Sequence, residues 1–308
     1  MAYALEIEGL EKTYANGLQA LKGIDLRVAE GDFFALLGPN GAGKSTTIGI
    51  ICSLVNKTGG TVRVNGVDID DNFPVAKRFL GVVPQEFNFN VFETVEDILI
   101  HQAGYYGIPL KVAMERIDRY LAKLGISEKR HTRARMLSGG MKRRLAIARS
   151  MMTSPSVIVM DEPSTGLDPQ SRNRVWEELA VLKDAGVTVL LSTHYMEEAT
   201  ILCDRLSVMD HGKILDEGTP DQMIERHAPK EVAQLRVSPV SIRTVRGYLT
   251  EHNITFREVG ALISVTGANG DRPDLSGLKN LDGVRTSYRA GNLEDVFLAI
   301  TGRELRDG

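Results

Sequence analysis

The sequence contains few cysteines, little charge imbalance and no long apolar run. Cys52 and Cys203 are the only cysteines among 308 residues, which excludes a disulfide framework and a zinc site built from cysteines. Lys and Arg number 37 against 40 Asp and Glu, a net charge of -3, whereas a dedicated DNA-binding protein carries a strong basic excess. No apolar run approaches the roughly 18 residues that a membrane-spanning helix needs. We therefore expect a cytoplasmic protein that binds no nucleic acid and meets a membrane only through a partner.

Short apolar segments predict a buried parallel sheet. Strands that are apolar at every position are buried on both faces, which is typical of a parallel sheet covered by helices. Helical patterns fall between these segments, over Thr46–Leu54, Met141–Met152 and Arg172–Lys183. The expected strands are Phe33–Leu37, Leu80–Val83, Val157–Met160, Val187–Leu191 and Leu206–Met209.

Further segments add an antiparallel layer and a helical insertion to this sheet. Asn16-Gly17 and Asn65-Gly66 each separate two alternating apolar segments, and Asn-Gly is a favoured hairpin turn because both residues tolerate a positive φ. The pattern is helical, with no buried strand, between Thr94 and Arg135. We expect a helical subdomain over about residues 94–150, inside an α/β domain that covers residues 1–228.

The pattern changes after about Pro229. The expected order is strand, helix, strand, strand, helix, strand and a closing helix, which is that of a ferredoxin-like split βαβ module. We expect a small α+β C-terminal domain over residues 229–308. Its expected elements are Val232–Val237, Ile242–His252, Ile254–Val259, Ala261–Val265, Leu275–Asn280, Val284–Tyr288 and Leu293–Leu305.

A phosphate-binding loop follows the first apolar strand. The pattern G-x-x-x-x-G-K-[ST] lies directly after Phe33–Leu37 and before a helical stretch, which is the context that this motif requires. Glycines let the backbone amides converge on phosphate oxygens at a helix N-terminus, Lys44 adds a positive charge at the β- and γ-phosphates, and the Ser45 hydroxyl can ligate Mg²⁺. The predicted nucleotide-binding residues here are Gly38, Pro39, Asn40, Gly41, Ala42, Gly43, Lys44, Ser45 and Thr46.

Polar residues follow two other strands of the predicted sheet. Asp161 and Glu162 end the strand that begins at Val157. We expect Asp161 to hold Mg²⁺ and Glu162 to deprotonate the water that attacks the γ-phosphate. His194 follows Val187–Leu191 in the same way, and ligands bind at the carboxyl ends of parallel strands. This position therefore favours a contact between His194 and the γ-phosphate.

The order of these motifs, with Leu137-Ser138-Gly139-Gly140-Met141 before the Asp161-Glu162 strand, resembles the ATP-binding subunits of ABC transporters over about Leu5–Gly218. The resemblance implies a P-loop NTPase core that binds ATP and Mg²⁺. The further roles that it implies are adenine stacking for Tyr14, γ-phosphate and Mg²⁺ sensing for Gln85, signature-loop contacts for Ser138, Gly139 and Gly140, a D-loop role for Asp168 and a switch role for His194.

The finer resemblance is to the ATPases of bacterial type-2 exporters, such as drug and polysaccharide exporters. It is carried by Pro84–Asn90, Leu137–Met141 and Asn292–Leu305. Met141 stands where the family pattern LSGGQ has glutamine. We expect this substitution to adjust the activity and not to abolish it. The basic cluster Lys142–Arg144 is expected to be a solvated helix face.

The resemblance implies an ATPase that drives a separately encoded membrane permease, acts peripherally on the cytoplasmic face of the cell membrane and supports export. Two identical chains would bury two ATP molecules between them, because one chain's phosphate loop leaves the γ-phosphate open and the partner's Ser138 loop closes it. An alternative is a non-transport ABC ATPase that acts on ribosomes or nucleic acid. Translation-type members usually carry two cassettes in one chain, and DNA-repair members carry long coiled-coil insertions; this chain has one cassette and a short insertion.

Overall fold

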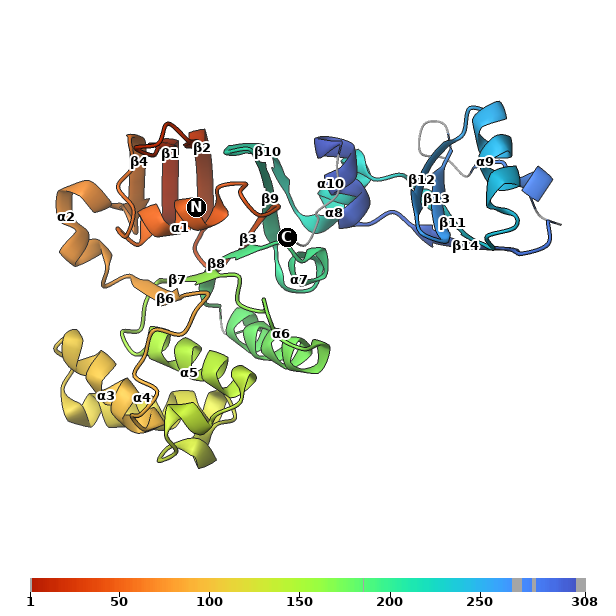
Figure 1. The fold of residues 1–308 in the computed structure, drawn as a ribbon. Helices are drawn as coiled ribbons and strands as arrows, with labels where there is room; N and C mark the ends of the chain where they lie inside the picture. Colours follow the sequence, from red (N-terminus) through yellow and green to blue (C-terminus); the bar gives the residue numbers. More distant parts are fainter. Residues whose placement is uncertain (1, 185, 268–272, 279–280, 303–308) are drawn as a thin grey trace. The chain divides into compact units, whose positions relative to one another are not determined.

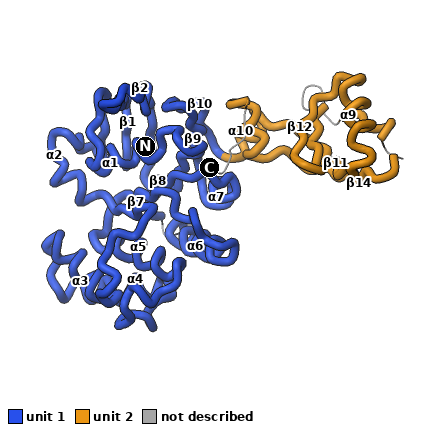
Figure 2. The backbone as a smooth tube through the Cα atoms, in the orientation of Figure 1, with its two compact units in different colours: residues 1–219, 306–308 blue, residues 220–305 orange. Residues whose placement is uncertain are grey.

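A computed structural model describes residues 2–184, 186–267, 273–278 and 281–302 (Figure 1). The chain divides into two compact units between Thr219 and Pro220 (Figure 2). Within the described residues, no helix is both long enough and apolar enough to span a bilayer.

The first unit is built on a six-stranded sheet with the order β10-β9-β3-β8-β7-β6. Five strands run parallel, and only the edge strand β10 runs antiparallel to its neighbour β9. Every residue of the apolar strand β3 is buried, and so is every residue of β8, although β8 also carries Thr188, Ser192 and Thr193. The strands are β3 (Phe33–Leu37), β6 (Leu80–Val83), β7 (Val157–Asp161), β8 (Thr188–Thr193), β9 (Arg205–Asp210) and β10 (Lys213–Gly218).

A second, antiparallel sheet with the order β2-β1-β4-β5 forms the expected outer layer. Asn65 and Gly66 both have a positive φ, as a tight hairpin between β4 and β5 requires. The first hairpin is looser, because only Gly17 of the Asn16-Gly17 pair has a positive φ and the Tyr14 amide bonds to the Leu18 carbonyl. The strands are β1 (Tyr3–Thr13), β2 (Gln19–Ala29), β4 (Gly59–Val64) and β5 (Val67–Asp68).

Helices cover both faces of the six-stranded sheet. Helix α1 lies between the two sheets, whereas α5, α6 and α7 lie on the other side (Figure 1). Helices α3 to α5 form the helical insertion, and the reciprocal capping bonds between Thr94 and Asp97 begin α3. The helices are α1 (Lys44–Ile51), α2 (Ile69–Ala76), α3 (Val95–Tyr105), α4 (Leu110–Lys123), α5 (Gly139–Met151), α6 (Pro169–Asp184) and α7 (Met196–Leu202), with 3-10 turns η1 (Ser127–Lys129) and η2 (Ala134–Met136).

The second unit is a four-stranded antiparallel sheet with the order β12-β13-β11-β14. Its apolar face packs against α9. The division from the first unit falls earlier than the expected 228/229 boundary, because α8 packs against α10. The elements are α8 (Pro220–His227), β11 (Glu231–Val237), α9 (Ile242–Glu251), β12 (Thr255–Val259), β13 (Leu262–Thr266), η4 (Ser276–Leu278), β14 (Val284–Ala290) and α10 (Leu293–Thr301).

Two expected helices of the second unit differ from the structure. The Leu275–Asn280 segment contains the short 3-10 turn η4 in place of a helix, and its last two residues lie outside the described part of the chain. The closing helix α10 ends at Thr301, where Gly302 takes a left-handed conformation, before the expected end at Leu305. Residues 303–305 of that expected helix also lie outside the described residues.

Candidate active site

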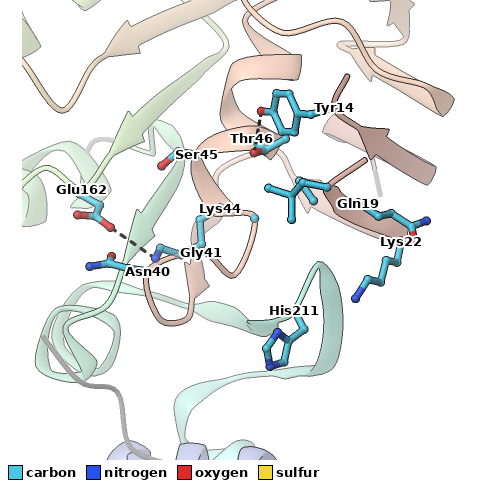
Figure 3. Close-up of a pocket in the computed structure, with 13 residues that line it drawn as sticks. Tyr14, Gln19, Lys22, Asn40, Gly41, Lys44, Ser45, Thr46, Glu162 and His211 are labelled. Carbon is cyan, nitrogen blue, oxygen red and sulfur yellow. Dashed lines mark hydrogen bonds and ion pairs between the residues drawn. The ribbon is translucent and has the colours of Figure 1, made fainter. Parts of the chain in front are cut away.

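A pocket of about 290 Å³ opens at the carboxyl end of β3 (Figure 3). The phosphate loop and the start of α1 form one wall, and Glu162 from the end of β7 lies opposite (Figure 3). Residues of the β1–β2 turn, of β2 and of the β9–β10 turn form the rest. The lining residues are Tyr14, Leu18, Gln19, Ala20, Lys22, Asn40, Gly41, Gly43, Lys44, Ser45, Thr46, Glu162 and His211.

Two glycines allow the phosphate loop to take its shape. Gly43 has a φ of 110°, which a residue with a side chain rarely adopts, and a Cβ there would lie 2.8 Å from Leu21. A Cβ on Gly38 would lie 2.2 Å from the Met209 carbonyl oxygen, so the loop can approach β9 only because this position has no side chain. Such a loop before a helix N-terminus presents backbone amides to an anion.

The buried side chain of Lys44 is held at the base of this loop. Its Nζ donates to the carbonyl oxygens of Gly38 at 2.8 Å and Pro39 at 3.1 Å. The same atom lies 3.5 Å from Glu162 Oε1. Burial lowers the pKa of Lys44, although the Glu162 carboxylate acts in the opposite direction. The sequence placed Lys44 in the phosphate loop, but its pairing with Glu162 comes from the fold.

Glu162 is surrounded by groups that stabilise its charged form. His194 Nδ1 lies 3.4 Å from Oε1, Thr165 donates to Oε2 at 3.1 Å, and Gln85 Nε2 lies 3.4 Å from Oε2. The hydrogen bond from His194 and the charge of Lys44 outweigh burial and lower the pKa of Glu162 to about 2. The residue also has a φ of 46°, and its amide donates to Ser192 Oγ at 3.0 Å. A carboxylate held in this way is ionised at neutral pH.

Asp161 is the last residue of β7, directly before Glu162. Its Oδ1 accepts hydrogen bonds from Ser192 at 2.5 Å and from Ser45 at 3.2 Å. A carboxylate and a hydroxyl brought together beside a phosphate loop are oxygen ligands of the kind that Mg²⁺ prefers. The Gln85 side chain, also expected at the metal, donates from Nε2 to Glu162 Oε2. The oxygen ligands that Ser45 and Asp161 offer therefore fit a magnesium ion.

The aromatic residue expected to stack on adenine lies at the pocket. Tyr14 directly precedes the turn between β1 and β2, and its hydroxyl lies 3.2 Å from Thr46 Oγ1 (Figure 3). Lys12 lies over the ring, with Nζ 4.8 Å from the ring centroid. This contact orients the ring beside the phosphate loop, where a nucleotide base can reach it.

Some of the predicted site residues do not line the pocket of their own chain. Ser138, Gly139, Gly140 and Asp168 are absent from the described residues that form it. The Ser138 hydroxyl instead accepts a hydrogen bond from the Met141 amide at 3.3 Å and begins α5. The Asp168 carboxylate accepts from the Ser171 amide at 3.0 Å near the start of α6, and hydrogen bonding by the Ser171 hydroxyl and amide lowers the pKa of Asp168. Because Met141 contributes its backbone amide, this cap does not need the glutamine of the family pattern.

Sequence reasoning missed the wall formed by β2 and the β9–β10 turn. Gln19 and Lys22 line the pocket together with His211, which lies far along the chain from the phosphate loop. Backbone hydrogen bonds bring them there: the Lys22 amide donates to Gly212, and the Gly212 amide donates to Ala42, each at 2.9 Å. No motif marks these residues, because only the pairing of distant segments unites them.

The basic cluster Lys142–Arg144 is not a solvated face as expected. Arg143 is 2% exposed and donates to the carbonyl oxygens of Pro84 at 2.7 Å and Gln85 at 3.0 Å. Arg144 forms a 2.5 Å ion pair with Glu178 of α6. The helical register explains the error, since α5 turns these two side chains toward its neighbours.

Known proteins share this architecture. Residues 21–165 match the family model described as ABC transporter. The Nod factor export ATP-binding protein I of Cupriavidus pinatubonensis is 38% identical over 98% of this chain and 92% of its own length, and that of Cupriavidus metallidurans is 37% identical over the whole of both chains.

Solved structures resemble the chain as well. A subunit of the ABC transporter complex cbiONQ of Clostridium perfringens gives a TM-score of 0.66 at 27% identity, over 82% of this chain and 100% of its own. A cassette solved as a dimer in a post-hydrolysis state, bound to ADP and Pi, gives a TM-score of 0.62 at 27% identity, over 70% of this chain and 98% of its own.

Proposed function

The chain belongs to the ATP-binding subunits of ABC transporters and is an ATPase of an export system, and we propose that two copies work together on a separately encoded membrane permease. The observation that best supports the catalytic part of this proposal is the position of Glu162. It lies between Lys44 of the phosphate loop and His194 of the β8 terminus.

The phosphate loop and Lys44 bind the phosphates of ATP in this proposal. Backbone amides around Gly41 and Gly43 surround the phosphate oxygens, and the N-terminus of α1 favours their negative charge. Lys44 then exchanges its contact with Glu162 for the β- and γ-phosphates. Ser45 and Asp161 would hold Mg²⁺, which supplies positive charge to the transferred phosphoryl group.

Glu162 acts as the general base on the attacking water. Its carboxylate is ionised before ATP binds, because Lys44 and His194 both stabilise the negative charge. When Lys44 turns to the phosphates, one of these partners is lost and the carboxylate becomes a stronger base. His194 and Gln85 remain to orient it. The site is thereby activated by the binding of its own substrate.

A second copy of the chain completes the site. The signature loop at Ser138 begins α5 and does not reach the pocket of its own chain. A partner's Ser138, Gly139 and Gly140 would contact the γ-phosphate from the open side, with Asp168 of the D-loop at the same interface. Two identical chains would thus enclose two ATP molecules, and hydrolysis would let the two chains separate.

The permease would contact the loop that follows Gln85. Phe87 and Phe89 in this loop lie 5.0 and 5.7 Å from the guanidinium groups of Arg143 and Arg149 of α5. Phe92 and Tyr105 nearby in the sequence are 65% and 85% exposed. Large exposed apolar side chains are typical of protein interfaces. We place the protein on the cytoplasmic face of the cell membrane and assign cargo selection to the permease.

Hydrolysis by the purified protein tests the catalytic proposal. Phosphate release from MgATP is expected for the wild type and for Lys213→Met, which changes an exposed lysine of β10. Lys44→Met is expected to lose ATP binding and hydrolysis, because it removes the buried charge at the phosphates. Equal hydrolysis by Lys44→Met and the control would contradict the assignment of this pocket.

A further inference from the structure

The second unit contains a cavity of its own, of about 430 Å³. The cavity lies between the four-stranded sheet and the helices α8 and α10, on the side of the sheet opposite α9 (Figure 1). Its volume falls within the range of about 300 to 1,000 Å³ that is typical of small-molecule sites. No described residue lines both this cavity and the nucleotide pocket. The proposed ATP chemistry therefore makes no use of the cavity.

The sheet supplies a polar floor to this cavity. Ser264 and Thr266 alternate along β13 with residues that pack against α9, so they face the opposite side. Arg257 of β12 lies opposite Ser264 in register, and Thr255 of the same strand lies opposite Thr266. All four residues line the cavity. The floor therefore groups a guanidinium with hydroxyls, and both kinds of group donate hydrogen bonds to anions.

Apolar side chains form another part of the lining. Val232 of β11 is 1% exposed, and it lies on the same side of the sheet because its neighbour Ala233 packs against α9. Leu298 and Ala299 of α10 and Pro229 of the segment before β11 line the cavity as well. A ligand that matches this lining has an apolar body beside its charged group, because burial of apolar surface favours binding.

Two contacts hold α10 against the sheet and keep the cavity formed. Arg289 of β14 donates from its two terminal nitrogens to Asp295 of α10, at 2.6 and 3.0 Å. A Cβ on Gly291, in the turn between these elements, would lie 2.2 Å from the Pro229 carbonyl oxygen. The absence of a side chain at Gly291 thus lets this turn pack on the segment before β11. A site that is shaped before its ligand arrives binds at a smaller entropic cost.

The charge of the described lining is positive. Arg257 and Arg289 stand against one carboxylate, Asp295, among the described residues that line the cavity. Because Asp295 forms its ion pair with Arg289, the charge of Arg257 is in excess within this lining. A guanidinium is always ionised, and its fork of N–H groups matches the oxygens of an anionic group. The lining therefore favours an anion over a neutral molecule of the same shape.

We propose that the second unit binds a small organic anion with an apolar body in this cavity. Arg257 and the hydroxyls of Ser264 and Thr266 hold the charged group, whereas Val232 and Leu298 contact the apolar body. The site is independent of the proposed ATP chemistry, because the residues that form it belong to the second unit alone.

Fluorescence titration of the whole chain tests this site with anilinonaphthalene sulfonate, an aromatic body that carries one sulfonate group. MgADP is present throughout, so that nucleotide occupies the pocket of the first unit. Phenylnaphthylamine has the same aromatic body without the sulfonate. We expect saturable binding of one sulfonate probe per chain, with a Kd about tenfold below that of the neutral amine, because the charged group adds hydrogen bonds. Equal affinities for the two probes, or no saturable binding of the sulfonate, would overturn the proposal.

Arg257→Gln separates the charge from the apolar contacts. We expect this variant to raise the Kd of the sulfonate probe about tenfold and to leave that of the neutral amine within about twofold. Arg236→Gln is the matched control, because Arg236 is an exposed arginine of the same sheet that does not line the cavity. It is expected to bind both probes as the wild type does. Equal affinity of the two variants for the sulfonate probe would overturn the proposal.

A variant that fills the cavity tests the apolar contacts. Ala299→Trp places an indole in the lining from an exposed position of α10, so the fold should tolerate it. It is expected to lose binding of both probes. Glu294→Trp carries the same side chain at an exposed position of α10 outside the lining, and it should bind as the wild type does. Urea unfolding checks that each variant is folded, and a folded Ala299→Trp that binds as tightly as this control would contradict the site.

Hydrogen exchange locates the bound probe without any substitution. We expect anilinonaphthalene sulfonate to slow the exchange of backbone amides in β12, β13 and α10, because these elements form the cavity. Protection confined to peptides of the first unit would show that the probe binds elsewhere, and it would overturn the proposal.

Discussion

Lys44 and Glu162 form a buried ion pair across the nucleotide pocket, with Nζ 3.5 Å from Oε1. One residue ends the phosphate loop and the other follows β7, so the pair joins two segments that are far apart in the sequence. Both side chains are nearly buried, at 4% and 6% exposure. In this pair, Glu162 is the anionic partner of Lys44. A bound phosphate would compete with Glu162 for the Lys44 ammonium group. We therefore expect ATP binding to release the Glu162 carboxylate from Lys44.

Glu162→Gln is expected to bind ATP and to lose turnover by about a hundredfold or more, because general-base catalysis contributes about 10² to 10⁴ in rate. Since the amide cannot accept the proton from water, MgATP should remain bound and hold two copies together. Light scattering with and without MgATP measures the dimer, and phosphate release measures turnover. Hydrolysis near the wild-type rate would remove Glu162 from the role of base.

Ser138→Arg is expected to prevent the ATP-dependent dimer and to leave ATP binding by the monomer intact. The bulky cation would occupy the position that faces the partner's γ-phosphate, whereas the pocket of the same chain does not include Ser138. Light scattering of Glu162→Gln with and without the added Ser138→Arg change measures this effect. Ser138→Ala is the control for the lost helix cap, which is worth about 1 kcal/mol. A nucleotide-loaded dimer of the Ser138→Arg variant would refute the shared site.

The ion pair also predicts how stability depends on pH. The pKa of Glu162 in the folded protein, about 2, lies below its ordinary value of 4.5. Its contribution to the free energy of unfolding is therefore complete above pH 4.5 and is lost as the pH falls toward 2. This contribution is at most on the order of 3 kcal/mol, since one pKa unit corresponds to about 1.4 kcal/mol.

Urea unfolding followed by Trp176 emission measures this dependence. The difference in stability between the wild type and Glu162→Gln is expected to be constant from pH 8 to pH 5.5 and to shrink below pH 4.5. Glu197→Gln, with an exposed side chain, should show no such dependence. A difference that grows as the pH falls would contradict the charge assigned to Glu162.

The two thiols are expected to be inert in the folded protein. Burial and the charge of Asp161 raise the pKa of Cys52 to about 12, and burial raises that of Cys203 well above its ordinary value. Because the thiolate is the reactive form, an aromatic disulfide reagent at pH 8 should react with both thiols only after guanidinium is added. Rapid reaction of either thiol in the native protein would show that its segment opens.

The strands of the six-stranded sheet could be predicted closely, because each buried strand is a continuous apolar segment of the sequence. Phe33–Leu37 and Leu80–Val83 match β3 and β6 residue for residue. The phosphate loop and the Asp161-Glu162 pair could also be found from the sequence, since each motif is continuous and ends a recognisable strand. Their side chains meet because parallel strands end at one edge of a sheet.

Other parts of the site could not be predicted from local patterns. Lys22 and His211 enter the pocket through pairing between β2 and the β9–β10 turn, which depends on segments almost 190 residues apart. Arg143 was expected in solvent because a run of basic residues gives no sign of which one turns inward. Its burial depends on the carbonyl groups of Pro84 and Gln85, which only the folded chain brings near α5.

Identification of the proteins that bind this ATPase tests whether it drives a membrane permease. Glu162→Gln would be purified from detergent-solubilised membranes of its own host with MgATP, and the proteins that copurify would be identified. We expect a single polytopic permease together with a second copy of the chain, and we expect Lys44→Met to capture less of both. Recovery of ribosomal or DNA-associated proteins with no membrane protein would contradict transport and leave only the ATPase.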